Sequence, residues 1–184
     1  MNVEELKEQA EHAHESGSKR IGLTMAIVAV LLATTTMLSH RAHTEEVVLK
    51  GDANDQWSYY QAKNIRAHMY AADAKIVALL PEGKELAQEF AEMAKQEKEG
   101  LPAKGSAPAK DGAEKIQDRA RERDKETHLT GLKANYFDAA ELFLEISIVL
   151  CSIALLAEMK AIWRVSFITT AIGILVAARG LLLY

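Results

Sequence analysis

Three long apolar runs constrain the fold of this chain more than any other feature of its sequence. The runs cover residues 21–38, 139–157 and 165–184, and each has about 17–20 residues, which as a helix crosses the roughly 30 Å hydrocarbon core of a bilayer. Charged residues, 26% of the chain, gather between the first and second runs. The pattern predicts an all-α integral membrane protein with three transmembrane helices, over residues 19–40, 139–157 and 165–184.

The basic residues that flank these runs predict an orientation. Lys19 and Arg20 precede the first run, and Lys160 and Arg164 lie in the short turn 158–164 between the second and third runs. Short flanking segments rich in Lys and Arg stay on the cytoplasmic side of a membrane. We therefore expect the N-terminus and this turn to be cytoplasmic.

The N-terminal residues 1–18 carry apolar residues at helical spacing and are expected to form a cytoplasmic amphipathic segment. The segment is acidic, and no small-residue cleavage motif follows the first apolar run, which is therefore interpreted as an uncleaved anchor. The same orientation places residues 41–138 and the C-terminal Tyr184 outside the cytoplasm.

The outer region 41–138 is expected to form an antiparallel helical stalk of the coiled-coil type. Its first helix, 52–80, is predicted to begin at a capping residue, Asp52 or Asn54, because these side chains accept hydrogen bonds from the free N–H groups of a first helical turn. Pro81 cannot continue a helix and ends it.

Three further segments complete the predicted stalk. Residues 82–99 have the pattern of a short charged helix, and residues 100–112 hold two of the three prolines and three glycines, which is typical of a loop. From Leu129 to Ala157 apolar residues recur at spacings of three and four. We therefore expect one continuous helix from residue 113 through the second membrane span, with a single coiled-coil seam.

Helix 52–80 carries two apolar stripes that are offset by five residues and so lie about 150° apart. Such a helix has two neighbours. One is the chain's own return arm, and the other is either helix 82–99 or a second subunit, which we favour because an alanine stripe allows close approach; ordinary core positions of a monomeric bundle are the alternative. The expected interaction face contains Trp57, Tyr60, Asn64, Ala67 and Ala71, and the other stripe contains Ala62, Ile65, Met69, Ala72, Ile76 and Leu79.

Two ionisable residues, Glu145 and Arg179, lie inside the apolar runs, where such residues need a partner or a function. They are similarly far from the outer ends of their runs, so the first hypothesis is an intramembrane ion pair that fixes the register of the hairpin. Asp138 and Glu141 precede Glu145 on a polar stripe. The alternative is that Glu145 lines an ion or proton path in an oligomer.

The sequence contains no motif for catalysis or cofactor binding. It has no Gly-rich phosphate loop, no H-E-x-x-H, no Cys/His cluster and no G-x-S-x-G, so we expect no enzyme activity, catalytic residue, metal or cofactor. The single cysteine, Cys151, is interpreted as a packing residue. A net charge of -4 argues against nucleic acid as a partner.

The segment 56–65, Gln-Trp-Ser-Tyr-Tyr-Gln-Ala-Lys-Asn-Ile, follows one membrane anchor and precedes a charged helical region with two C-terminal spans. In this motif and layout the chain resembles a family of small bacterial membrane proteins catalogued as domain of unknown function 4337. The resemblance implies a location in the bacterial inner membrane. It supplies no activity, ligand or catalytic residue.

These observations favour a non-enzymatic membrane protein that assembles through its stalk, as a homo-oligomeric scaffold or as an accessory subunit of a larger membrane complex. We expect the lipid bilayer to surround its transmembrane helices. The alternative function is a channel or transport component in which Glu145 lines the path.

Overall fold

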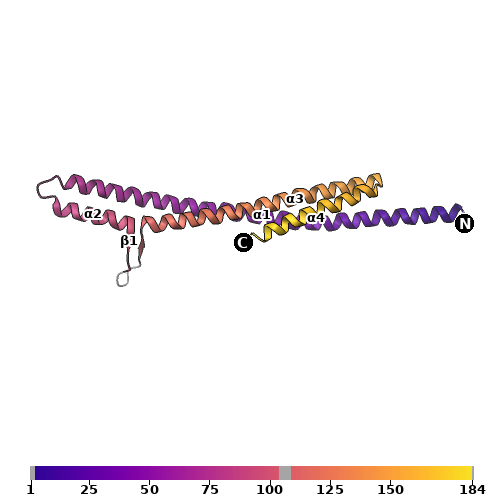
Figure 1. Cartoon of the computed structure of the whole chain (residues 1–184), viewed down its shortest axis with the longest axis horizontal. Helices are drawn as coiled ribbons and strands as arrows, with labels where there is room; N and C mark the ends of the chain where they lie inside the picture. The colour runs from indigo at the N-terminus through magenta and orange to yellow at the C-terminus, as the bar shows by residue number, and fades with distance from the viewer. Residues whose placement is uncertain (1–2, 104–108, 184) are drawn as a thin grey trace. The chain divides into compact units, whose positions relative to one another are not determined.

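The computed structural model describes residues 3–103 and 109–183, with side chains from residue 19 onward. Within these residues it contains four helices and two short strands (Figure 1). The predicted all-helical class is confirmed, while the amphipathic face expected for residues 1–18 lies outside the described side chains. In chain order the elements are α1 (Val3–Val77), α2 (Lys84–Glu99), β1 (Gly100–Leu101), β2 (Lys110–Asp111), α3 (Ala113–Ala157) and α4 (Lys160–Leu181).

The first helix, α1, continues without a break from Val3 to Val77. The predicted helix start at Asp52 or Asn54 is therefore wrong. A Cβ built at Gly51 would meet no atom within 4 Å, so this glycine serves no turn or close contact. A glycine inside a helix costs about 1 kcal/mol, which the long helical stretches on both sides outweigh.

The charged helix predicted over residues 82–99 is confirmed as α2, but the loop predicted over residues 100–112 holds a small element of sheet. β1 and β2 pair antiparallel, with Gly100 opposite Asp111 and Leu101 opposite Lys110. Gly100 has a φ of 90°, a left-handed conformation that favours glycine. The two strands thus close the base of the loop.

The return helix α3 extends from Ala113 to Ala157, as the continuous apolar periodicity predicts, and passes through Gly131 without interruption. The turn that follows is shorter than the predicted 158–164, because α4 begins at Lys160. Glu158, with a φ of 56°, and the extended Met159 make the reversal.

By its internal contacts the chain divides into two units. The apolar unit consists of residues 1–45 and 129–184, and the charged unit consists of residues 46–128.

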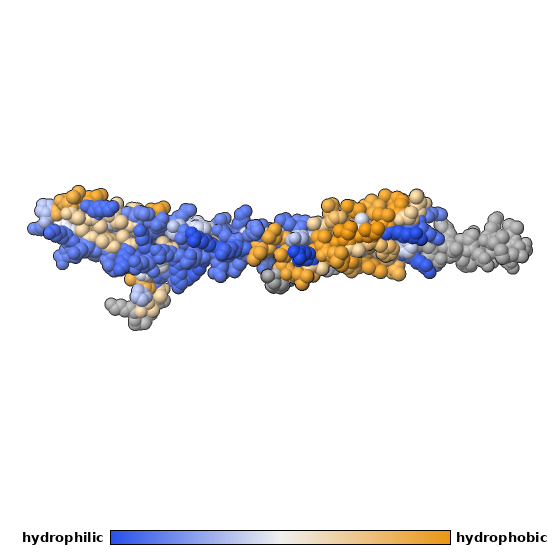
Figure 2. Space-filling view, viewed as in Figure 1, coloured by the Kyte–Doolittle hydropathy of each residue, from blue (hydrophilic) through white to orange (hydrophobic). Residues whose placement is uncertain are grey.

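The apolar unit exposes large hydrophobic side chains on its outer surface. Val30 of α1 is 67% exposed, Leu156 of α3 is 87% exposed and Leu175 of α4 is 70% exposed. Figure 2 shows a largely hydrophobic surface over the apolar unit. Three helices of the chain, which include the described part of α1 together with α3 and α4, are long and apolar enough to cross a membrane. Small residues such as Ser147 and Ser166 are buried between them instead.

The charged unit is built from the second half of α1, from α2 and from the first part of α3. Its core consists of small and medium-sized side chains, because Ala67, Ile116 and Ala120 are completely buried. At the α1–α2 contact the Tyr70 and Phe90 rings stack with their centroids 6.2 Å apart. Aromatic pairs of this kind stabilise a helix contact beyond the area that they bury.

Candidate functional site

A row of hydrogen bonds links polar side chains of α1 to carboxylates of α3 in the apolar unit. The Ser39 hydroxyl donates to one carboxylate oxygen of Asp138, and Nε2 of His43 lies 2.9 Å from the other. Further along the same two helices, Oγ1 of Thr36 donates to Oε1 of Glu141 at 2.7 Å. Two of the carboxylates in the predicted polar stripe are therefore bound by α1.

The third carboxylate of this stripe, Glu145, has no such partner. Oγ of Ser152 lies 3.7 Å from Sδ of Met25, and this contact continues the antiparallel register of the hydrogen bonds above. The register places Glu145 level with Leu32, whose side chain is apolar. Glu145 is exposed, and within the described residues it takes part in no hydrogen bond or ion pair.

A seam of small and hydroxyl side chains joins α3 to α4. Oγ of Ser147 donates to the carbonyl oxygen of Ser166 at 2.9 Å and lies 2.6 Å from Oγ1 of Thr170. Sγ of Cys151 lies 3.2 Å from Oγ of Ser166. Ser147, Cys151 and Ser166 are completely buried, and an unpaired polar group in such a position costs about 1–3 kcal/mol. The hydrogen bonds avoid that cost.

Two glycines of α4 continue this seam. A Cβ built at Gly173 would lie 3.1 Å from Cγ of Leu144, and one built at Gly180 would lie 3.2 Å from Cε1 of Phe137. Ser147 contacts Thr170, and three residues earlier on α3 Leu144 contacts Gly173, which lies three residues later on α4. Phe137 and Gly180 lie ten residues from Ser147 and Thr170 in the same opposite directions. One antiparallel register therefore holds along the whole seam.

The predicted ion pair between Glu145 and Arg179 is not formed in the structure. Both side chains are exposed, and neither takes part in an ion pair with a described residue. The seam places Arg179 level with Asp138, which is about 10 Å along the axis from Glu145. The prediction placed Glu145 and Arg179 by their distances from the ends of the apolar runs. The register between α3 and α4 is instead set by the small residues of the seam.

The face of α1 predicted to receive a second subunit packs inside the charged unit instead. Nε1 of Trp57 donates to Oδ2 of Asp124 on α3 at 2.8 Å, and Ala67 is completely buried. The other members of this face are half-buried: Tyr60, Asn64 and Ala71. The aromatic and alanine residues therefore form a contact within the chain.

The second stripe, which lies along α1 and ends at Leu79 in the turn just after this helix, is the one that remains exposed. Ile65 and Met69 are each 59% exposed, Ile76 is 62% exposed and Leu79 is 85% exposed. Figure 2 shows a hydrophobic patch at the end of the charged unit where α1 leads into α2. We name this surface the Ile65 stripe, and it comprises Ala62, Ile65, Met69, Ala72, Ile76 and Leu79.

A carboxylate of α2, that of Glu97, binds two cations of α1. It accepts hydrogen bonds from Nζ of Lys63 at 3.1 Å and from Nε of Arg66 at 3.3 Å, and the Lys63 side chain is only 7% exposed. Partial burial by itself raises the pKa of Glu97. The hydrogen bonds and charges of Lys63 and Arg66 outweigh this effect, so the pKa of Glu97 lies below its ordinary value of 4.5.

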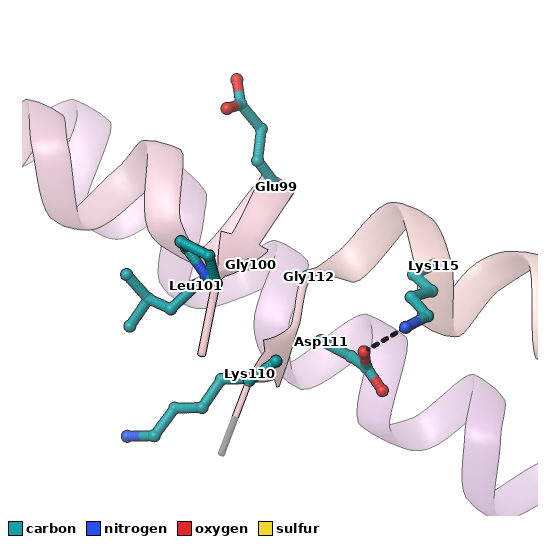
Figure 3. Close-up of a pocket in the computed structure, with 9 residues that line it drawn as sticks. Glu99, Gly100, Leu101, Lys110, Asp111, Gly112 and Lys115 are labelled. Carbon is teal, nitrogen blue, oxygen red and sulfur yellow. Dashed lines mark ion pairs between the residues drawn. The ribbon is translucent and has the colours of Figure 1, made fainter. Parts of the chain in front are cut away.

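A pocket of about 390 Å³ lies beside the β1–β2 pair and includes Leu101, Lys110 and Asp111 in its lining (Figure 3). The Asp111 carboxylate binds Lys115 at 2.8 Å and also Arg119. The hydrogen bond from Lys115, together with Arg119, lowers the pKa of Asp111 below its ordinary value. The charge of this carboxylate is therefore already compensated.

Metal binding has no obvious site in the described part of the chain. No group of three His, Cys, Asp or Glu residues there could hold a metal ion.

The α3–α4 seam and the α1 partners of Asp138 and Glu141 are the features that sequence reasoning missed. A signal for the seam exists, because Ser166, Gly173 and Gly180 recur at every seventh position of α4 within an apolar run. Small residues repeated on one helix face allow a close helix contact in a membrane. The hydroxyls of α1 give no comparable signal, since such side chains also bond back to their own helix, as Thr34 does to the carbonyl oxygen of Val30.

These observations define the class of the protein: an all-helical chain with three helices that are long and apolar enough to cross a membrane. The chain belongs to the family described as a domain of unknown function (DUF4337), whose family model matches residues 17–183. A search of curated proteins and a search of solved structures find no match. The family predicted from segment 56–65 is thus confirmed, and it brings no activity with it.

Proposed function

We propose that this chain is a non-enzymatic membrane protein that assembles with copies of itself through the Ile65 stripe, as a scaffold or as an accessory subunit of a larger membrane complex. The exposure of that stripe is the observation that carries the proposal, because contiguous apolar surface on a soluble unit usually marks an interaction site. Burial of one Ile, Leu or Met side chain contributes about 1.5–3 kcal/mol. Four such side chains in each copy supply a large part of an association energy.

The proposed location is a bacterial inner membrane, with the N-terminus cytoplasmic and the charged unit periplasmic. Support comes from exposed basic residues that flank the apolar runs: Lys19 and Arg20 lie within α1 just before the run 21–38, and Lys160 and Arg164 lie at the start of α4. Short segments of this kind stay in the cytoplasm. In this arrangement the charged unit is the stalk that brings two copies together.

Native mass spectrometry of the full chain, extracted in a mild detergent, tests the assembly. We expect dimers or larger oligomers for the wild type and monomers for the double variant Ile65→Asn/Ile76→Asn. Val47→Asn is the matched control, because Val47 is 70% exposed on the same helix but lies outside the stripe. A monomeric wild type with no copurifying protein would contradict the proposal.

Glu145 supports a second candidate function, that of a channel or transport component. It is exposed and has no partner within the described residues, although Asp138 and Glu141 next to it on α3 are both bound by α1. A carboxylate that faces lipid is costly, so such residues usually face water or another protein surface. In an oligomer, Glu145 would line an ion or proton path.

Ion and proton flux into liposomes tests this second function. We expect Glu145→Gln to reduce the flux by at least about tenfold while native mass spectrometry shows unchanged assembly. Arg179→Gln is the control, because Arg179 is also exposed but lies at a different level. If the wild type carries no flux above empty liposomes, or if Glu145→Gln carries as much as the wild type, the second candidate is wrong.

A further inference from the structure

The Ile65 stripe repeats with the seven-residue period of a coiled coil. From Ala62 to Leu79 its positions follow one another at alternating steps of three and four residues, which is the spacing that keeps two helices in contact along one seam. We propose that two copies of this chain pair along this stripe as a parallel, in-register coiled coil. The inference rests on the proposed function and adds the identity and the orientation of the partner.

Within the residues that the structure describes, the stripe stays exposed and no helix of the chain covers it. α1 is one uninterrupted helix, so its N-terminal part cannot fold back over residues 62–79. The five residues 104–108 are Lys-Gly-Ser-Ala-Pro and include no large apolar side chain. α2 and α3 contact the opposite face of α1, through Glu97 and Asp124. We therefore infer that another molecule packs against the Ile65 stripe.

A second copy complements the polar residues that flank the stripe. In a parallel coiled coil, the residue just before an a position of the heptad faces the residue five places later in the partner. Here the a positions are Ala62, Met69 and Ile76. This rule places His68 beside Asp73 of the second copy, and Gln61 beside Arg66 of the second copy. Each of these pairs joins a donor to an acceptor. His68 and Asp73 take part in no hydrogen bond or ion pair within the described residues of one chain.

The membrane anchors favour this parallel arrangement over an antiparallel one. Two copies with one orientation in one bilayer share the chain direction of α1. An antiparallel pair with Met69 opposite Ala72 would bring Arg66 to Asp73, but it would also bring His68 to Lys75, two groups that do not complement each other. Parallel pairing gives each copy two complementary contacts.

Disulfide crosslinking in native membranes tests the inference, with the full chain in a Cys151→Ser background. In a parallel pair Leu79→Cys forms covalent dimers on mild oxidation. Lys125→Cys, an exposed position on α3, is the control and stays monomeric. Ala62→Cys and Leu79→Cys on differently tagged, co-expressed copies do not link to each other, because these sites are about 25 Å apart along a parallel pair.

A charge reversal provides a second test, which a folding defect would not mimic. His68→Glu faces Asp73 of the second copy and should reduce crosslinking of Leu79→Cys several-fold. Adding Asp73→Lys to His68→Glu should restore it.

The possible outcomes separate the inference from the proposed function. Oligomers in native mass spectrometry together with no link at Leu79→Cys, or with a link between Ala62→Cys and Leu79→Cys, would overturn the parallel pairing and leave the scaffold proposal standing. Failure of Asp73→Lys to restore crosslinking would also overturn it. Monomers in every experiment would remove both.

Discussion

Gly173 of α4 lies directly against Leu144 of α3: a Cβ built at residue 173 would lie 3.1 Å from Cγ of Leu144 and 3.2 Å from the carbonyl oxygen of Ala140. The same register brings Gly180 to Phe137. Close packing of small residues, and not a buried ion pair, therefore aligns the two helices of the apolar unit.

Substitution of Gly173 should disturb this alignment. Gly173→Val places a branched side chain against a backbone oxygen that cannot move aside, and overpacking of this kind costs about 1–3 kcal/mol. We expect a lower thermal unfolding midpoint for the full chain in detergent, measured by circular dichroism.

The matched control is Gly22→Val, because a Cβ at Gly22 would meet no atom within 4 Å. That variant should unfold at nearly the wild-type temperature. Equal losses of stability for the two variants would show that the cost is a property of valine in these helices and not of the α3–α4 contact.

Double-mutant cycles should distinguish the polar contacts that form from the one that does not. Ser39→Ala and Asp138→Asn are expected to be coupled by about 0.5–1 kcal/mol, since the Ser39 hydroxyl donates to Asp138. Glu145→Gln and Arg179→Gln should be additive to within about 0.5 kcal/mol, because the two residues lie at different levels of the seam. Free energies of unfolding measured in one detergent give both values. Strong coupling between Glu145 and Arg179 would indicate that the two residues do form an ion pair, and it would contradict this account.

The ion-paired Glu97 should make the charged unit sensitive to acid. Because the pKa of Glu97 is lower in the folded chain than its ordinary value of 4.5, its contribution to stability is present above that value and is lost as the pH falls through the lower, folded pKa. Unfolding followed by circular dichroism between about pH 7 and pH 3 should therefore show a decline that begins near 4.5.

The corresponding variant, Glu97→Gln, removes the titrating group and leaves the nearly buried Lys63 without its anion. We expect a loss of about 1–3 kcal/mol near neutral pH and a shallower decline in acid. A decline as steep as that of the wild type would assign the acid sensitivity to other carboxylates.

The helices were predictable from the sequence where their pattern is continuous. The spacing from Leu129 to Ala157 predicts an uninterrupted helix over these residues, and α3, which extends from Ala113 to Ala157, confirms it. The false helix start at Asp52 has a simple cause. An aspartate that caps a helix and an aspartate on the solvent side of a helix look alike in a single sequence.

The role of each α1 stripe was not predictable in the same way. Both stripes are visible in the sequence, but the structure decides which of them α2 covers. The turn between α1 and α2 passes so close to itself that a Cβ at Gly83 would lie 1.9 Å from the carbonyl oxygen of Val77. This turn returns the chain onto the side of Lys63 and Ala67 and leaves Ile65 exposed. No local pattern specifies that direction.

The candidate pair of Glu145 and Arg179 shows a second limit of sequence reasoning. The lengths of the apolar runs give helix depth only to within a few residues, whereas one helical turn decides whether two side chains meet. The contacts of Ser147 and Gly180 fix that register, and they involve small residues that hydropathy overlooks.

Fluorescence energy transfer between labelled copies in liposomes tests the central claim, that the Ile65 stripe joins copies of this chain, most directly. Donor-labelled and acceptor-labelled full-length protein would be reconstituted together and diluted with increasing lipid. The account predicts transfer that persists on dilution for the wild type and for Val47→Asn, and transfer that falls with dilution for Ile65→Asn/Ile76→Asn. Transfer that falls equally for all three proteins, or that persists equally for all three, would contradict it.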